Sequence, residues 1–82
     1  MKFIVEVRLN PGAKNQVVDA FELRGPNRSA NVKFEKAWLG SRDDLAFVLV
    51  DSNEEASVVE ACCNWNAFGK TQVYPVTDIE QF

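Results

Sequence analysis

Leu45-Ala46-Phe47-Val48-Leu49-Val50 is the stretch that decides the fold of this 82-residue chain. A short apolar run that is rich in β-branched and aromatic residues and follows a turn is typical of a buried strand. Because the run is apolar on both faces, it predicts a central strand that is covered on both sides. It is also the longest uncharged apolar segment, and it is far too short to cross a membrane.

Three further segments alternate as strands do. In residues 2–9 the apolar side consists of Phe3, Val5, Val7 and Leu9, and the mixed side of Lys2, Ile4, Glu6 and Arg8. Residues 32–39 place Val32, Phe34, Lys36 and Trp38 on one side, and charges on both sides favour an edge strand. Residues 73–76 contain Pro75 and predict a last edge strand.

Two helices are expected between these strands. Asn10 as an N-cap and Pro11 in the first turn predict a helix over about residues 12–23, ended by Arg24-Gly25-Pro26. Ser52 and Glu55 form a capping box that opens a second helix ending near Asn66. The inward stripe of that helix is expected to consist of Ala56, Val59, Cys62, Cys63 and Asn66, flanked by Val58 and Trp65.

The element order is therefore strand, helix, strand, strand, helix, strand. With right-handed crossovers this order gives an α+β, ferredoxin-like βαββαβ sandwich. We expect one domain over residues 1–82, with an antiparallel four-stranded sheet in the order 4-1-3-2 and both helices on one face. Strands one and three, the two most apolar, are then the central ones.

Composition excludes several kinds of chemistry. The chain has no histidine, so Ser-His-Asp and Cys-His catalysis and His-ligated metal sites are impossible within one chain. Its two cysteines, Cys62 and Cys63, are adjacent, which is a poor position for a disulfide and an incomplete metal site. We therefore expect free thiols, no metal, no cofactor and a cytoplasmic location.

Nucleic acid is also an unfavourable partner. Nine Lys and Arg against twelve Asp and Glu give a net charge of −3, whereas phosphate contacts need clustered cations. RNA-recognition motifs share this topology, but Asp43 and Asp44 stand where their third strand carries a basic residue and a glycine. The first strand offers Phe3 alone for stacking.

The sheet face away from the helices is the candidate site. Strand one contributes Ile4, Glu6 and Arg8, strand two Phe34, Lys36 and Trp38, strand four Tyr74, and strand three one of its two apolar sets. That is too much apolar area to leave in water, so we predict a homodimer through this face. A small molecule in a cavity between the subunits would contact Glu6, Arg8, Lys36, Trp38 and Tyr74.

Plainer interpretations stay open for the same residues. Glu6 and Arg8 are two positions apart, so they can form an ordinary ion pair within the chain or across the dimer axis. The Tyr74 hydroxyl can lie at a rim. The alternative function is a non-catalytic structural or regulatory homodimer with a filled interface, and no reaction is assigned.

Short motifs along nearly the whole chain resemble a known family. They are Met1-Lys2-Phe3-Ile4-Val5, Arg24-Gly25-Pro26, Val32 before Ala37-Trp38, Phe47-Val48-Leu49-Val50-Asp51, Asn64-Trp65-Asn66 with Phe68, and Val73-Tyr74-Pro75-Val76. In this order they are similar to the family of small uncharacterised proteins called domain of unknown function three-three-zero-three.

The resemblance implies a ferredoxin-like subunit related to the dimeric α/β-barrel group, in which two sheets meet face to face. Members of that group include cofactor-free monooxygenases and small isomerases whose substrates lie in the subunit cavity. The family itself has no assigned activity, so the resemblance carries over no catalytic residue. In the family, the Trp of the second strand is often followed by His. Here Trp38 matches this pattern and Leu39 does not, so an activity that used the His is in doubt.

Overall fold

The computed structural model describes residues 1–24 and 31–81. Four strands and two helices follow the predicted order, with short 3-10 turns after the second helix and the last strand. The elements are β1 (Lys2–Leu9), α1 (Lys14–Arg24), β2 (Val32–Leu39), β3 (Leu45–Ser52), α2 (Glu55–Ala61), η1 (Cys62–Ala67), β4 (Gly69–Val76) and η2 (Ile79–Gln81).

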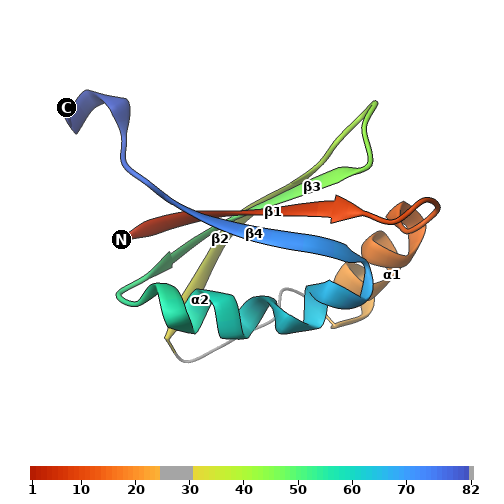
Figure 1. The fold of residues 1–82 in the computed structure, drawn as a ribbon, viewed down its shortest axis with the longest axis horizontal. Helices are drawn as coiled ribbons and strands as arrows, with labels where there is room; N and C mark the ends of the chain where they lie inside the picture. Colours follow the sequence, from red (N-terminus) through yellow and green to blue (C-terminus); the bar gives the residue numbers. More distant parts are fainter. Residues whose placement is uncertain (25–30, 82) are drawn as a thin grey trace.

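The four strands form one antiparallel sheet in the order β2-β3-β1-β4, which confirms the predicted arrangement. Both helices lie on the same side of it, so the fold is the expected α+β ferredoxin-like sandwich (Figure 1). Central β1 pairs with β3 on one side and β4 on the other, with Val5 opposite both Val48 and Val73.

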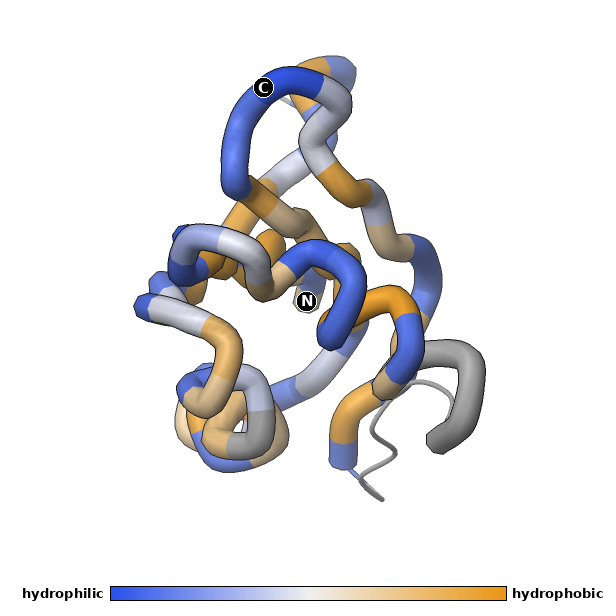
Figure 2. The backbone as a smooth tube through the Cα atoms, turned by 90° about the vertical axis from the view of Figure 1, so that its right-hand side faces the viewer, coloured by the Kyte–Doolittle hydropathy of each residue, from blue (hydrophilic) through white to orange (hydrophobic). Residues whose placement is uncertain are grey.

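The core lies between the sheet and the helices. Phe3, Val5 and Val7 of β1 are at most 1% exposed, and Val58 of α2 is fully buried. Alternation in β1 and β3 directs one apolar set of each strand to this layer. In Figure 2 hydrophobic residues, in orange, alternate with hydrophilic ones, in blue, along the backbone.

A β-bulge in β2 changes the predicted alternation. Phe34 pairs with Val50 and Lys36 with the next residue, Leu49, so Glu35 is an extra residue in the strand. Val32 and Phe34 therefore pack against the core, whereas Lys36 and the residues after it follow a shifted alternation. The prediction that Phe34 shares a face with Lys36 and Trp38 is wrong, because one inserted residue reverses the facing of those that follow.

The first helix begins later than the sequence predicts. Residues 10–12 form a turn in which the Ala13 amide donates to the Asn10 carbonyl at 3.0 Å and Gly12 adopts φ 80°. The helix starts at Lys14, and the Ala13 carbonyl accepts the bond from the Val17 amide. Asn10 is therefore not the N-cap. The helix ends at Arg24, and the predicted Gly25-Pro26 stop lies outside the described residues.

The predicted capping box of the second helix is also wrong. Ser52 is the last residue of β3, is 6% exposed, and donates through Oγ to the Asn31 carbonyl at 2.7 Å. The same oxygen accepts from the Glu54 amide at 3.3 Å, so Ser52 holds the turn before the helix, and the N-cap residue is Glu54.

The inward face of the second helix differs from the prediction as well. Val58 and Cys62 face the core, whereas Val59 and Cys63 are exposed. The α-helix ends at Ala61, and a 3-10 turn carries the chain on to Ala67. Cys62 is therefore buried as predicted, whereas Val58, expected only as a flank, faces the core in place of Val59.

Candidate functional site

All five predicted site residues lie on the side of the sheet opposite the helices. We call this surface the open face. It consists of Ile4, Glu6 and Arg8 of β1, Leu45, Phe47 and Leu49 of β3, Lys36 and Trp38 of β2, and Lys70, Gln72 and Tyr74 of β4. The set of β3 that faces the core is Ala46, Val48 and Val50. The register thus settles which face of each strand the open face uses.

Two cross-strand rows form the centre of the open face. One row runs Lys36, Leu49, Ile4, Tyr74 and the next runs Trp38, Phe47, Glu6, Gln72. Paired side chains on neighbouring strands are in contact range, so the aliphatic and aromatic members form one continuous apolar patch. Trp38 is 43% exposed and Tyr74 is 42% exposed.

The Glu6 carboxylate lies at the border of this patch. Arg8 Nε donates to Glu6 Oε1 at 3.0 Å, so the pair forms within the chain, as one of the two interpretations had it. The side chain of Glu6 is 18% exposed and that of Arg8 is 72% exposed. The carboxylate is therefore recessed among neighbours while the guanidinium reaches outward, where it can meet an acidic group.

The other candidates are also paired locally. Lys36 Nζ lies 5.4 Å from the centre of the Trp38 ring, which is a cation–π distance. The Tyr74 hydroxyl donates to the Gln72 amide oxygen. Each polar candidate thus has an identified partner on its own strand, and the arrangement can present one carboxylate, one phenol and several cations to whatever covers the face.

Sequence reasoning missed Lys70 and Gln72. The last strand was expected from residue 73, whereas β4 begins at Gly69 and runs for eight residues. Gln72 lies opposite Glu6, and Lys70 lies opposite Arg8. The alternation of Lys70, Gln72 and Tyr74 could have revealed this longer strand, since polar residues at every second position mark a solvent-facing side.

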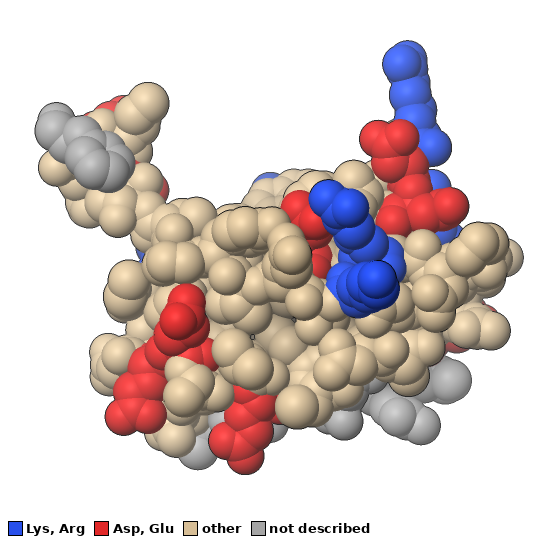
Figure 3. Space-filling view, viewed as in Figure 1, with Lys and Arg blue, Asp and Glu red and all other residues tan. Residues whose placement is uncertain are grey.

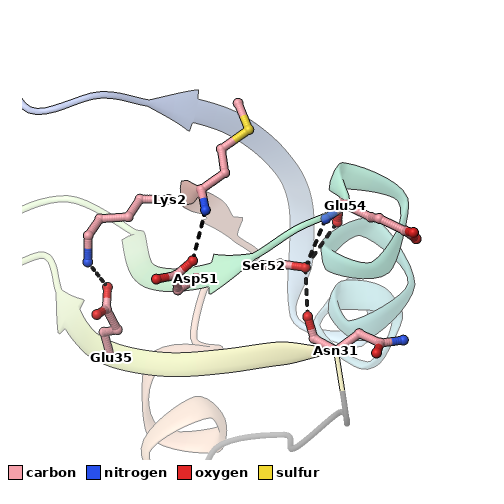
Figure 4. A network of polar contacts seen from close by, with 7 residues as sticks. Lys2, Asn31, Glu35, Asp51, Ser52 and Glu54 are labelled. Carbon is pink, nitrogen blue, oxygen red and sulfur yellow. Dashed lines mark hydrogen bonds and ion pairs between the residues drawn. The ribbon is translucent and has the colours of Figure 1, made fainter.

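A second polar group occupies the end of the sheet near the N-terminus (Figure 4). Lys2 Nζ and Glu35 Oε2 are 2.6 Å apart, and the Met1 amino group lies 3.0 Å from Asp51 Oδ1. The hydrogen bond to Glu35 raises the pKa of Lys2, and the N-terminal ammonium lowers the pKa of Asp51. These pairs join β1, β2 and β3 at one end and leave the centre of the open face to the candidate residues.

One apolar hollow among the described residues lies away from the centre of the open face. It has a volume of about 250 Å³ and sits beside α1 on the helix side of β2 and β3. Its lining consists of Val17, Val18, Ala37, Trp38, Leu39, Ala46, Phe47, Val48 and Trp65. Trp38 is the one predicted site residue in that lining, so this hollow is not the predicted cavity.

The two thiols are free, with Cys62 buried and Cys63 exposed. Burial raises the pKa of the Cys62 thiol to about 11, as expected for a cysteine that packs as a small apolar side chain. Among residues 1–24 and 31–81, no cluster of three acidic or cysteine side chains could hold a metal ion. No helix in that part of the chain has the length and hydrophobicity needed to span a bilayer.

Comparison with known proteins agrees with the sequence motifs. No curated protein matches the chain. A family model described as Domain of unknown function (DUF3303) matches residues 1–82, the whole length of the sequence. Strand order and helix placement fit the ferredoxin-like subunit that the motifs imply. The chain therefore belongs to the DUF3303 family.

Proposed function

We propose that this protein acts as a homodimer whose two open faces meet and enclose a binding site for a small molecule with an apolar body and an acidic head. One observation carries the proposal: the apolar patch of Ile4, Phe47, Leu49 and Trp38 lies on the side of the sheet opposite both helices, with the Glu6–Arg8 pair at its border. Apolar patches of this kind on small proteins mark interfaces or ligand sites.

The size of the face supports a second copy as the cover. Strands spaced about 4.8 Å apart, each eight residues long at about 3.3 Å per residue, span roughly 500 Å² for four strands. Two such faces would bury about 1,000 Å² in projection, the lower limit for a specific interface. Face-to-face closure is also what the resemblance to the dimeric α/β-barrel group implies.

The charges on the face support an acidic ligand. Lys36, Arg8 and Lys70 lie on the open face, and the two central rows carry one carboxylate, that of Glu6. The carboxylates of Asp51 and Glu35, at the end of the sheet near the N-terminus, are paired with the Met1 amino group and Lys2. The chain as a whole is acidic, so this local excess of cations stands out. Trp38 and Phe47, which are cross-strand neighbours, would contact the apolar body of the ligand.

A filled interface without a ligand is the second candidate function. It is favoured by the local pairing of the polar groups: Arg8 with Glu6, Lys36 with Trp38, and Tyr74 with Gln72. Polar side chains that already have hydrogen-bond partners can be buried between two sheets without a ligand.

The free thiols support a reducing compartment such as the cytoplasm, whether or not the dimer binds a ligand.

Sedimentation equilibrium tests the dimer. The wild-type chain should sediment as two copies at micromolar concentration, and Phe47→Glu should sediment as one, because it places a charge in the centre of the buried face. Val59→Glu, on the exposed side of α2, is the matched control and should remain dimeric. A wild-type mass of a single chain would refute the proposal.

Anilinonaphthalene sulfonate, an apolar fluorophore with an acidic head, tests the ligand site. It should bind the dimer saturably and quench the tryptophan fluorescence by energy transfer. Arg8→Met should weaken binding about tenfold, the loss expected for one charge-assisted contact. Lys33→Met removes a cation at the far end of the sheet and should leave binding unchanged. A dimer that binds none of the probe would support the filled interface instead.

A further inference from the structure

Residues 77–81 form a short arm that leaves the end of β4. The arm lies on the side of the sheet away from the helices, which is the side of the open face (Figure 1). The Gln81 amide donates to the Asp78 carbonyl at 2.9 Å, which closes the η2 turn. Ile79 in this turn is 85% exposed, the highest value among the large apolar side chains of the described residues.

The composition of the arm indicates what it would contact. Ile79 is an apolar anchor with an acidic residue on each side, Asp78 and Glu80. An exposed isoleucine that is held in place by a turn gains stability only when another surface covers it. The complementary surface is therefore apolar and carries cations.

Such a surface exists at the opposite end of the open face. Arg8 and Lys70 are paired across β1 and β4, with Leu45 beside Arg8 on β3. In Figure 3 several Lys and Arg side chains lie over the half of the sheet away from the arm, with Asp and Glu side chains beside them. Trp38 and Phe47 lie one row further in and supply apolar area next to these cations.

The arm cannot reach this surface on its own subunit. It begins at the far end of β4, and an eight-residue strand is roughly 26 Å long. In a face-to-face dimer whose two-fold axis runs across the strands, each arm lies over the opposite end of the facing sheet. A second copy thus brings the acidic arm to the basic end.

We propose that the arm of each subunit packs on the open face of the other, with Ile79 against the Leu45 and Trp38 end and Glu80 near Lys70. This inference rests on the dimer of the proposed function and is independent of any ligand. It specifies an antiparallel arrangement of the facing sheets and makes residues 77–81 part of the interface.

The dimer dissociation constant, measured by sedimentation equilibrium, tests the arm. Ile79→Ser should raise it about 100-fold, about tenfold for each of the two symmetric contacts. Val59→Ser removes a comparable exposed aliphatic side chain from α2 and should leave it unchanged. If the dissociation constant of Ile79→Ser is unchanged while Phe47→Glu is still monomeric, the proposed packing of the arm is refuted and the proposed dimer stands.

A charge exchange tests where the arm lies. Glu80→Lys and Lys70→Glu should each weaken the dimer, and the double variant should return it to within about threefold of the wild type. Rescue of Glu80→Lys by Lys2→Glu instead would place the arm at the other end of the sheet and overturn the proposed arrangement. A wild-type chain that is monomeric throughout would refute both the dimer and the arm.

Discussion

Substituting Gly69 by alanine should be the most damaging small change in this fold. Gly69 opens β4, where it lies opposite Leu9 at the end of β1. A Cβ atom on residue 69 would lie 1.9 Å from the Arg8 carbonyl oxygen and 2.9 Å from the Leu9 Cα. Both are backbone atoms of the central strand, so no side-chain rotation can make room.

The expected loss follows from the displacement that alanine would force. The start of β4 would have to move by about 1 Å, which weakens the Leu9–Gly69 pairing and the 2.8 Å bond from the Asn10 amide to the Phe68 carbonyl. Each backbone hydrogen bond contributes about 1 kcal/mol, and overpacking adds about 1–3 kcal/mol. The two contacts and the overpacking together give an expected loss of about 3–5 kcal/mol, a large share of the roughly 4–12 kcal/mol typical of a chain this long.

Urea unfolding followed by far-ultraviolet circular dichroism measures this loss. Gly12→Ala is the matched control, since Gly12 has φ +80° and no atom lies within 4 Å of the position that a Cβ would take there. It should lose only about 1 kcal/mol, the strain of a left-handed alanine, and Gly12→Asn should lose less. A loss below about 1 kcal/mol for Gly69→Ala, or equal losses at the two glycines, would refute the close approach of β4 to β1.

Three further outcomes are expected. Phe34→Ala should destabilise the fold by about 2 kcal/mol in the same unfolding assay, while Lys36→Ala changes it by less than about 0.5 kcal/mol; equal effects would contradict the bulge. Val58→Ala should lose about 2–3 kcal/mol, and a smaller loss than Phe34→Ala would contradict its full burial. Ellman's reagent should modify one thiol in the native protein and two after unfolding, because burial raises the pKa of Cys62 to about 11. Since that pKa is raised in the folded state, its contribution to stability is complete below pH 9 and declines as the pH rises towards 11.

The strand order and the placement of the helices could be predicted because they depend on strong periodic patterns. Residues 45–50 are apolar at every position and residues 2–9 at every second one, and both became central strands. Strand periodicity also assigns Glu6 and Arg8 to one side, which is the open face. Lys36 and Trp38 lie on the same face only because of the bulge at Glu35, which periodicity could not predict.

The helix starts could not be predicted so well. Ser52 and Asn10 have the side chains of N-cap residues, but tertiary contacts use them differently. Ser52 Oγ donates to the Asn31 carbonyl of a distant segment while it accepts from the Glu54 amide, and the backbone amide of Asn10 donates to the Phe68 carbonyl, which holds residue 10 beside β4 before the helix begins. A side chain of the N-cap type can bond to several backbone groups, and the fold determines which of them lie near enough.

The sequence by itself determined which segments are strands, which faces are apolar, and that no histidine chemistry is available. The tertiary structure decided the register, and with it the bulge at Glu35 that sends Phe34 into the core and Lys36 to the open face. It also decided that Lys70 and Gln72 lie beside Arg8 and Glu6. The physical reason is that periodicity is a property of one strand, whereas register and cross-strand neighbours depend on hydrogen bonds between segments far apart in the chain.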